Sequence, residues 1–505
     1  MKKVISIILA AVLAFSVCIP AFAGDDGCDC GITPVVYVVG FGDALYKNTD
    51  TENRESIFPP EGGVIAKAVP DLLVAVTCLL AGYNDGFGTF VSKGANVMLG
   101  GLACNPDGTA PEGTGIKPTG PIVDTHKLPA FTPEDGMDEG YFTFRYDWRL
   151  SPVDNAKLLD EYISEVKNVT GHDEIVLSAH SQGNTIVMTY IQLYGTDGIE
   201  KLICLSPAYQ GISLIGSLFT RDVNVAGKGE ALEEFLKGIM GFEDSQSKLI
   251  VSLVSFINSY GIIDAILNSL QKTLDSELDK VFDECLIDVF GSMPGLWTFV
   301  PAEKYEEAKA SMFGDNEKYA AIIEKTDYYY ENVQTKTVEL LTEAKANGTD
   351  VVIAAGYNIS TIPVTDAAAT HSDLLIDTEY MTLGATCPAI TETLGDGYVQ
   401  AENGCGHNHV SPENVIDAST CAFPEYTWFF KGNGHADFEE DYCGFIEWAI
   451  RYDGQPTVWS DEKYPQFMQE GEDGLVPVNP KTETDGRSDE EIIFSSVIDL
   501  IKESF

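Results

Sequence analysis

The segment around Ser181 constrains the fold of this chain more than any other part of the sequence. An apolar stretch over residues 174–178 leads into Ala179-His180-Ser181-Gln182-Gly183, and a helix-compatible stretch over residues 184–193 follows. In this strand–turn–helix setting, a small-x-Ser-x-Gly pentapeptide forms a nucleophile elbow, whose tight turn strains the backbone of the serine. The helix N-terminus behind the turn favours a developing negative charge. The alternative interpretation is an ordinary helix-capping serine.

Continuous apolar strands elsewhere in the chain predict a parallel sheet. Strands that are apolar at successive positions, rather than at every second one, are typical of a sheet buried on both faces. Residues 31–40 form such a strand, further strands are expected at residues 141–146, 201–206 and 350–356, and helices at residues 64–81 and 154–169. Strands separated by helices indicate an α/β fold, with a mostly parallel central sheet flanked by helices.

Residues 212–325 have a different character and predict a helical insertion. The stretches at residues 231–240 and 248–274 have helical patterns, and the second is apolar over more than one face. This segment is either a helical bundle packed on the sheet, or a helical cap whose apolar inner surface lines an acyl-binding cleft. The predicted organisation is a core at residues 24–211, a cap or lid at residues 212–325, and the second part of the core at residues 326–505.

The first 23 residues have the pattern of a secretory signal peptide. Lys2 and Lys3 precede an apolar stretch over residues 4–17, and Ala21-Phe22-Ala23 is a small-x-small cleavage site. We therefore expect cleavage before Gly24 and a secreted or extracytoplasmic protein. We expect no later stretch to be long and apolar enough to span a bilayer, and therefore no transmembrane segment in the mature chain.

Charge and cysteine content narrow the partners and the chemistry. The formal charge of −47 argues against nucleic acid and anionic membranes as partners, and leaves room for transient contact with a lipid surface. Ten cysteines follow residue 23, and an even number in an exported protein predicts disulfides, above all within residues 387–443. Cys204 lies in an apolar strand and is expected to be a buried thiol instead.

A nucleophilic Ser181 requires a histidine base and an acid that orients it, in the chain order Ser, acid, His. Four histidines follow Ser181, and the preferred base is His435, in the glycine-rich loop at residues 432–437. His371, His407 and His409 are the alternatives. Cys405-Gly-His-Asn-His409 can also be considered as a zinc motif, but a disulfide-flanked polar loop is the preferred interpretation, so no metal and no cofactor is expected.

The preferred acid is Asp396, which lies between Gly395 and Gly397 at an expected strand end. Asp366 and Asp377 also follow the strand at residues 351–355 and compete with it. Asp473 follows every histidine and breaks the chain order. A surface turn is the alternative interpretation of Gly-Asp-Gly.

Two backbone N–H groups are expected to form the oxyanion hole. One belongs to Gln182, the residue after the nucleophile, and the other to Phe41, in the loop Val39-Gly-Phe-Gly42 after an early strand. Glycines on both sides of Phe41 allow that backbone to approach a substrate closely.

The order of these motifs resembles the lecithin–cholesterol acyltransferase-like family of α/β-hydrolases. The resemblance is carried by Val39-Gly-Phe-Gly42, Tyr146-Asp-Trp-Arg149, Ala179-His-Ser-Gln-Gly183, Ser206-Pro-Ala-Tyr-Gln-Gly211, Ser292-Met-Pro-Gly-Leu-Trp-Thr-Phe-Val-Pro301 and Gly395-Asp-Gly397. Ala179, Val39 and Tyr398 depart from the usual family residues and mark a distant, bacterial-type member. The resemblance implies an α/β-hydrolase fold with a lipid-facing cap and an acyl-enzyme formed on serine.

The expected function is that of a secreted serine hydrolase or acyltransferase acting on lipid esters, such as a phospholipase, lipase or O-acyltransferase, with Ser181, Asp396 and His435 as the triad. Hydrolysis and acyl transfer share the acyl-enzyme and differ in whether water or an alcohol resolves it. The alternatives are a non-lipid carboxylesterase and a catalytically silent hydrolase-fold binding protein at the cell surface.

Overall fold

The computed structural model describes residues 28, 30–49, 53–118, 120–126, 142–240, 254–255, 257–365, 369–401, 404–437, 440–471 and 474–479. The expected signal peptide at residues 1–23 lies outside these residues, as do Asp366 and Asp473.

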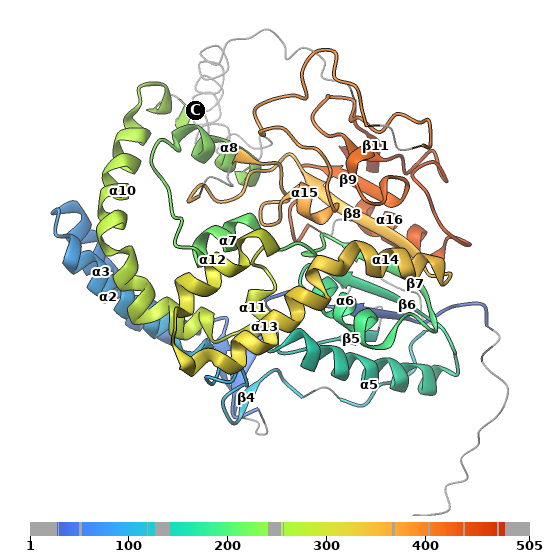
Figure 1. The fold of residues 1–505 in the computed structure, drawn as a ribbon, viewed down its shortest axis with the longest axis horizontal. Helices are drawn as coiled ribbons and strands as arrows, with labels where there is room; N and C mark the ends of the chain where they lie inside the picture. Colours follow the sequence, from blue (N-terminus) through green and yellow to red (C-terminus); the bar gives the residue numbers. More distant parts are fainter. Residues whose placement is uncertain are drawn as a thin grey trace, which may run out of the picture.

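An eight-stranded sheet forms the centre of the fold (Figure 1), in the order β11-β10-β9-β8-β7-β6-β1-β5. Its strands are β1 (Val35–Val38), β5 (Phe142–Phe144), β6 (Ile175–His180), β7 (Ile199–Leu205), β8 (Asp350–Tyr357), β9 (Thr427–Lys431), β10 (Phe467–Gly471) and β11 (Gly474–Pro477). Neighbouring strands pair in parallel except β10 with β11. The predicted α/β fold with a mostly parallel sheet is confirmed.

The register of the parallel strands brings the loops that carry the site to one edge of the sheet. Val38, at the end of β1, lies opposite Ala179 of β6, so the loop after β1 starts beside the Ser181 turn. β8 pairs with β9, so the chain leaving β8 and the chain leaving β9 emerge side by side. A small second sheet, β3-β2-β4, consists of β2 (Leu45–Lys47), β3 (Glu55–Phe58) and β4 (Thr114–Gly115).

Helices cover the sheet because their apolar faces need burial against it. The helices that contact the sheet are α5 (Pro152–Thr170), α6 (Gly183–Tyr194), α14 (Thr337–Ala346), α16 (Glu440–Arg451) and the short α15 (Thr378–Met381). Two more, α12 (Ala302–Phe313) and α13 (Ala320–Asn332), pack mainly on other helices. Single 3₁₀ turns lie at Gly100–Leu102, Glu317–Tyr319, Gln334–Lys336, Ala418–Thr420 and Pro424–Tyr426. Ser151 caps α5 by accepting the N–H of Val153, and Gly171 ends it in a left-handed conformation.

The predicted helical insertion contains α7 (Ser213–Phe219), α8 (Gly229–Met240), α10 (Ile262–Val281), a π-helical stretch (Phe282–Gly291), α11 (Pro294–Trp297) and α12. Its second part belongs to the main hydrophobic core, where Met293, Trp297 and Phe299 are buried together with the sheet. The expected helix at residues 231–240 is present. Of the helix expected at residues 248–274, residues 248–253 and 256 lie outside the described residues, and residues 262–274 belong to α10.

A helical hairpin, α2 (Gly62–Leu80) and α3 (Asn84–Leu99), packs on α10 at the periphery of the molecule (Figure 1). The 18-residue window Gly62–Leu79 is long and apolar enough, by length and composition, to cross a membrane, and only 11% of it is buried. The expectation that no such stretch follows residue 23 is therefore wrong on this criterion. Lys67, Pro70 and Asp71 interrupt the apolar pattern in the sequence, yet the helix continues through them.

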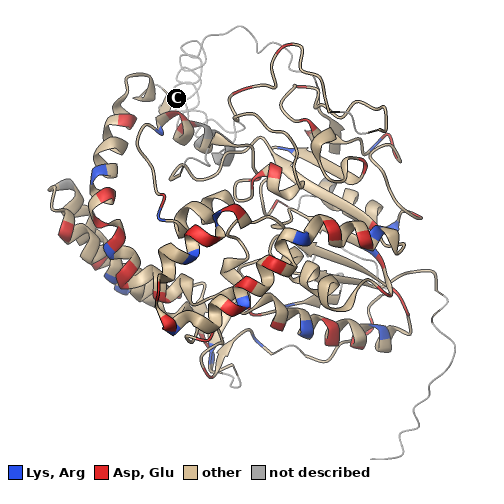
Figure 2. Ribbon diagram, viewed as in Figure 1, with Lys and Arg blue, Asp and Glu red and all other residues tan. Residues whose placement is uncertain are grey.

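Acidic residues are spread over the outer helices, with fewer basic residues between them (Figure 2). This distribution fits the formal charge of −47. α2 differs from these helices, because Lys67 and Asp71 are its only charged residues. The apolar face of α2 is therefore a local exception on an acidic surface.

Candidate active site

Ser181 occupies a strained turn between β6 and α6. Its φ angle is 53°, in the left-handed region that a residue with a side chain seldom adopts. A Cβ at Gly183 would come within 2.5 Å of the Val38 carbonyl oxygen, so only glycine fits two residues after the serine. The Asn184 side chain donates to the carbonyl oxygens of Ala179 (3.1 Å) and Leu205 (3.2 Å) and holds the turn in place. These features are those of a nucleophile elbow.

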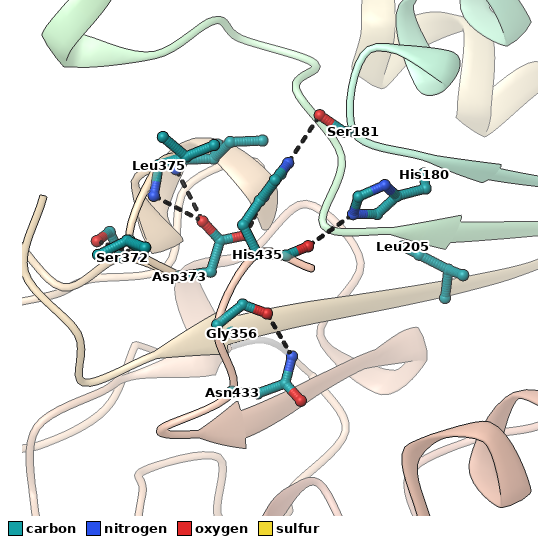
Figure 3. A network of polar contacts seen from close by, with 12 residues as sticks. His180, Ser181, Leu205, Gly356, Ser372, Asp373, Leu375, Asn433 and His435 are labelled. Atoms are coloured by element: carbon teal, nitrogen blue, oxygen red, sulfur yellow. Dashed lines mark hydrogen bonds and ion pairs between the residues drawn. The ribbon is translucent and has the colours of Figure 1, made fainter. Parts of the chain in front are cut away.

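His435 and Asp373 complete a hydrogen-bonded chain that begins at Ser181 (Figure 3). The Ser181 Oγ and His435 Nε2 atoms are 2.9 Å apart, and His435 Nδ1 lies 2.8 Å from Asp373 Oδ2. His435 lies in the loop after β9, and Asp373 in the segment after β8. The structure therefore brings together the serine and histidine expected from the sequence, with an aspartate that the sequence analysis did not select.

Asp373 is held as an ionised acceptor inside the protein. It is fully buried, and its Oδ1 atom accepts the backbone N–H groups of Leu375 (3.1 Å) and Ile376 (2.8 Å). Burial by itself would raise the pKa of Asp373, but its interaction with His435 and these backbone hydrogen bonds outweigh burial and lower the pKa. The carboxylate can then fix the His435 proton on Nδ1 and leave Nε2 free to accept one from Ser181.

Asp396 does not occupy the position expected of the acid. It lies in an exposed turn between Gly395 and Gly397, both with positive φ, and has no contact with His435 in the structure. The surface-turn interpretation of Gly-Asp-Gly therefore applies, and the assignment of Asp396 is corrected to Asp373. Asp377, the competing candidate that the structure describes, accepts the Ser213 backbone N–H (2.9 Å) and the Thr370 hydroxyl (2.9 Å) instead.

Asp373 satisfies the chain order that was applied to the other acids, but no glycine pair marks it in the sequence. A usable signal was its place after β8, the strand that pairs with the histidine-bearing strand β9. Adjacent parallel strands end at the same edge of a sheet, so the acid is best sought in the segment that follows the neighbouring strand. Asp373 follows that strand sooner than Asp377 or Asp396 but later than Asp366, so this signal narrows the choice of the acid and does not decide it.

His180 holds the backbone of the loop that carries the base, His435. Its Nε2 atom lies 2.8 Å from the carbonyl oxygen of His435, and the two rings are 4.8 Å apart. Burial lowers the pKa of His180 to about 3, and the neighbouring His435 adds to this effect. His180 is therefore neutral at pH 7, and its Nε2–H donates to the main chain of the loop that carries His435.

The loop after β1 lies directly against the nucleophile. A Cβ at Gly40 would come within 3.1 Å of Ser181 Cβ and 2.8 Å of His180 Nδ1, so glycine is needed for this approach. Within the described part of the chain, the backbone N–H groups of Phe41 and Gln182 donate no hydrogen bond. Both are available to a ligand at the edge of the sheet where Ser181 lies.

The Tyr146–Arg149 motif builds the support for this loop. The Tyr146 hydroxyl donates to the Val39 carbonyl oxygen (3.1 Å), and the Trp148 indole donates to that of Asp43 (2.9 Å). The Trp148 and Phe41 rings are 4.4 Å apart. Behind them, the buried Arg149 and Asp147 form an ion pair of 2.7 Å.

Gln182 connects the elbow to the helical insertion. Its buried side-chain amide donates to the carbonyl oxygens of Trp148 (3.1 Å) and Gly295 (2.8 Å). Phe299, from the same insertion, lies 5.7 Å from the Phe41 ring. Part of residues 212–325 thus contacts the residues beside Ser181.

None of the remaining candidate histidines hydrogen-bonds to Ser181 in the described structure. His407 stacks on Trp459 at 4.1 Å, and His409 contacts Gln466 (2.8 Å) and the Cys405 sulfur (3.1 Å). His371 is buried, and neither of its ring nitrogens has a hydrogen-bond partner in the described structure.

His371 should make the fold sensitive to acid. Burial lowers its pKa to about 4 from an ordinary 6.5, so below pH 6.5 the unfolded chain binds a proton that the folded chain does not. Stability is then lost as the pH falls, by about 2 kcal/mol between pH 7 and pH 5 from this residue. Urea unfolding of His371→Phe at both pH values should show a pH dependence smaller by that amount. An unchanged dependence would contradict the buried neutral histidine.

The predicted disulfides are absent from the described structure. None of the ten cysteines after residue 23 forms a disulfide, including the four within residues 387–443. Cys204 is buried, as expected, and burial raises its pKa to about 12. The thiol of Cys204 therefore remains protonated and unreactive at neutral pH.

Comparison with known proteins gives a family match over part of the chain. The sequence profile of the lecithin:cholesterol acyltransferase family matches residues 136–233, which include Tyr146–Arg149 and the Ser181 elbow. This part of the chain is thus similar to the lecithin:cholesterol acyltransferases, and it lies within an α/β fold. The crystal structure of the Tle4–Tli4 complex is similar over 64% of this chain and 75% of that chain, with a TM-score of 0.25 and 12% identity. No curated protein matches the sequence significantly.

The match to the lecithin:cholesterol acyltransferases supports an enzyme of the lipid-ester hydrolase or acyltransferase kind. It includes the serine but ends before Asp373 and His435. The positions of these two residues therefore come from the geometry of the fold alone.

Proposed function

We propose that this chain is a serine lipid esterase or O-acyltransferase that works through an acyl-enzyme on Ser181. The observation that carries the proposal is the chain of hydrogen bonds from Ser181 through His435 to Asp373, at 2.9 and 2.8 Å. A serine with a hydrogen-bonded base, which is in turn oriented by a third group, is the arrangement that nucleophilic acyl transfer requires.

The proposed reaction has two halves, formation of the acyl-enzyme and its breakdown, and the same three residues act in each. Ser181 Oγ attacks the ester carbonyl carbon, while His435 Nε2 takes the serine proton and returns it to the departing alkoxide. The acyl group is then bonded to Ser181. Water or an acceptor alcohol gives its proton to His435 and attacks the acyl carbon, and His435 returns that proton to Ser181. Asp373 keeps the imidazole oriented and stabilises its positive charge in both halves.

The Phe41 and Gln182 N–H groups are the proposed oxyanion hole. The close approach of Gly40 to Ser181 supports this assignment, because it places the start of the Phe41 loop beside the nucleophile. Donors that are already fixed before the reaction stabilise the developing charge without reorganisation. Trp148 and Tyr146 supply that rigidity through their hydrogen bonds to the loop.

Residues 212–325 are proposed to form the cap over this site. The contact of Gly295 with Gln182 and of Phe299 with Phe41 supports this role. Because Trp297 and Met293 belong to the main core, deletion of the whole segment would unfold the protein. The cap is therefore best tested by point substitutions.

A fluorophosphonate probe tests the proposed function, because it forms an adduct only with an activated serine. Peptide mapping should find the adduct on Ser181. The labelled protein should lose turnover of glycerolipid esters, measured with and without an acceptor alcohol to separate hydrolysis from acyl transfer. A folded protein that is not modified would support the silent binding protein instead.

The exposed apolar face of α2 favours the interpretation that the substrate is a lipid rather than a freely soluble ester. Leu73 is 62% exposed and Val76 51% exposed, on a helix whose only charges are Lys67 and Asp71. An exposed apolar helix face of this kind gains free energy by entering the interface of a lipid surface. The large negative charge predicts that this surface is zwitterionic rather than anionic.

Leu73→Glu should lower turnover of phospholipid in zwitterionic vesicles by about 10-fold, because burial of one leucine side chain is worth roughly 1.5–3 kcal/mol. Cleavage of a soluble short-chain ester should not change. Leu158→Glu is the matched control, since Leu158 is 50% exposed on α5 and should tolerate the same charge with both substrates. Equal losses with both substrates, or equal effects of the two variants, would argue against α2 as the lipid contact.

A further inference from the structure

A second cluster of reactive side chains lies apart from the active site. Cys28 and Cys30 precede β1, His126 lies in the described segment before β5, and His172 follows the end of α5. One ligand atom from each of the four residues lies within 4.8 Å of all the others. The cysteine–histidine pairs in contact are 96, 98 and 142 residues apart in the sequence. The cluster is therefore assembled by the fold and is not a local sequence motif.

The distances within this cluster fit a tetrahedral metal site. His126 Nε2 lies 3.4 Å from Cys30 Sγ and 3.7 Å from Cys28 Sγ, and His172 Nε2 lies 3.5 Å from Cys30 Sγ. A tetrahedron with zinc–nitrogen and zinc–sulfur bonds of about 2.1 and 2.3 Å has ligand–ligand edges of about 3.4–3.8 Å. All three observed separations fall within this range.

The surroundings orient the ligands as a metal site requires. Asp124 Oδ1 makes a short contact with His126 Nδ1 and also accepts the His126 backbone N–H, at 3.2 Å. A carboxylate on one ring nitrogen fixes the tautomer and directs the other nitrogen, here Nε2, at the metal. The His126 side chain is fully buried, so its Nε2 atom faces the two sulfurs rather than solvent.

The backbone brings the cysteine pair to the histidines. The Cys28 N–H donates to the Gly171 carbonyl oxygen at 2.7 Å, and Gly171 is the left-handed residue that ends α5. His172 is the next residue along the chain. The helix end therefore anchors the cysteine segment and presents His172 to it at the same time.

We propose that Cys28, Cys30, His126 and His172 bind one zinc ion in a structural site. Two thiolates and two imidazoles are the donor set that a closed, tetrahedral zinc site uses. Binding releases the two cysteine protons to solvent and joins three segments that are far apart in the sequence. Because β6 starts just after His172 and ends just before Ser181, the zinc site lies at the opposite end of that strand from the nucleophile. The ion therefore stabilises the fold and takes no part in ester chemistry.

The motif that first suggested zinc, around Cys405, does not assemble a comparable set in the described structure. Cys405 Sγ contacts His409 at 3.1 Å, but His407 stacks on Trp459. His409 has its other ring nitrogen on Gln466 at 2.8 Å. Cys405→Ser is therefore a matched control for a substitution at Cys30.

The test is the metal content of the purified full chain, kept in reducing buffer and reconstituted with Zn²⁺ alone. Wild type and Cys405→Ser should each hold about one zinc per chain, as a four-ligand structural site requires. Cys30→Ser should hold almost none. A chelator should lower the Tm of the wild type and of Cys405→Ser to that of Cys30→Ser.

A milder variant keeps the test decisive if Cys30→Ser does not fold. Asp124→Asn retains all four ligands and should weaken Zn²⁺ affinity by about 10- to 100-fold, measured by competition with a chromogenic chelator. Co²⁺ should give the visible absorption of a tetrahedral thiolate site in wild type and in Cys405→Ser. A zinc-free folded wild type after reconstitution would overturn the proposal, as would full zinc content in folded Cys30→Ser or a Cys28–Cys30 disulfide that persists in the reducing buffer.

Discussion

Replacing Ser181 with alanine should lower kcat for ester cleavage by about 10⁴- to 10⁶-fold, the range seen when a triad nucleophile is removed. The loss is this large because the acyl-enzyme cannot form and only binding and oxyanion stabilisation remain. The Tm should stay the same or rise slightly, since the strained turn then carries one polar atom less. Steady-state kinetics with a chromogenic ester, together with fluorophosphonate labelling, measure both effects.

Ser178→Ala is the matched control for this experiment. Ser178 lies on β6, the strand that leads into Ser181, is fully buried, and its hydroxyl has no hydrogen-bond partner in the described structure. Removing an unsatisfied buried hydroxyl is neutral or stabilising, so this variant should keep wild-type kcat and label fully. Substantial turnover by Ser181→Ala would show that another residue is the nucleophile, and the proposed function would then fail with it.

The parts of the fold that follow from local pattern were predictable. The β6–Ser181–α6 unit depends on residues within one short stretch, where small residues on both sides of the serine are needed for the turn and an apolar strand must precede it. The parallel sheet follows from strands that are apolar at successive positions, a pattern set by burial on both faces. The base was also predictable, because few histidines follow Ser181 and His435 lies in a glycine-rich loop.

The acid and the zinc cluster were not predictable, because both depend on contacts between distant segments. Gly395-Asp396-Gly397 has a strong local signal, but that signal specifies only a turn. Asp373 has a weak local signal and acquires its role from the pairing of β8 with β9. In the same way, no spacing rule joins Cys30 to His126, 96 residues away, until the end of α5 brings the segments together.

The exposure of α2 also could not be predicted from its apolar sequence pattern. Its apolar residues predicted a helix, and the helix is present, but a core helix and a surface helix of this composition have the same sequence pattern. Only the tertiary packing, in which α2 lies on α3 and α3 lies on α10, shows that one face of α2 is left uncovered. The distinction matters for function, because the same residues stabilise a core or bind a lipid surface.

Asp373→Asn should lower kcat by about 10⁴-fold with the fold intact, as expected for an orienting acid in a serine triad. The asparagine amide would donate to His435 Nδ1, so the imidazole proton would move to Nε2 and that atom could no longer accept the proton of Ser181. Asp396→Asn should retain wild-type kcat, because that side chain is exposed and His435 Nδ1 is bonded to Asp373 instead. His435→Ala should approach the loss of Ser181→Ala.

Asp377→Asn is the control for burial, since Asp377 is a buried carboxylate in the same segment that bonds Ser213 and Thr370. It should change the free energy of unfolding more than kcat. Fluorophosphonate labelling separates the two roles further, because a wrong imidazole tautomer slows the reaction at Ser181 while leaving circular dichroism unchanged. A silent Asp373→Asn beside an inactive Asp396→Asn or Asp377→Asn would reverse the assignment, and the hydrogen bond between Asp373 and His435 would then be structural.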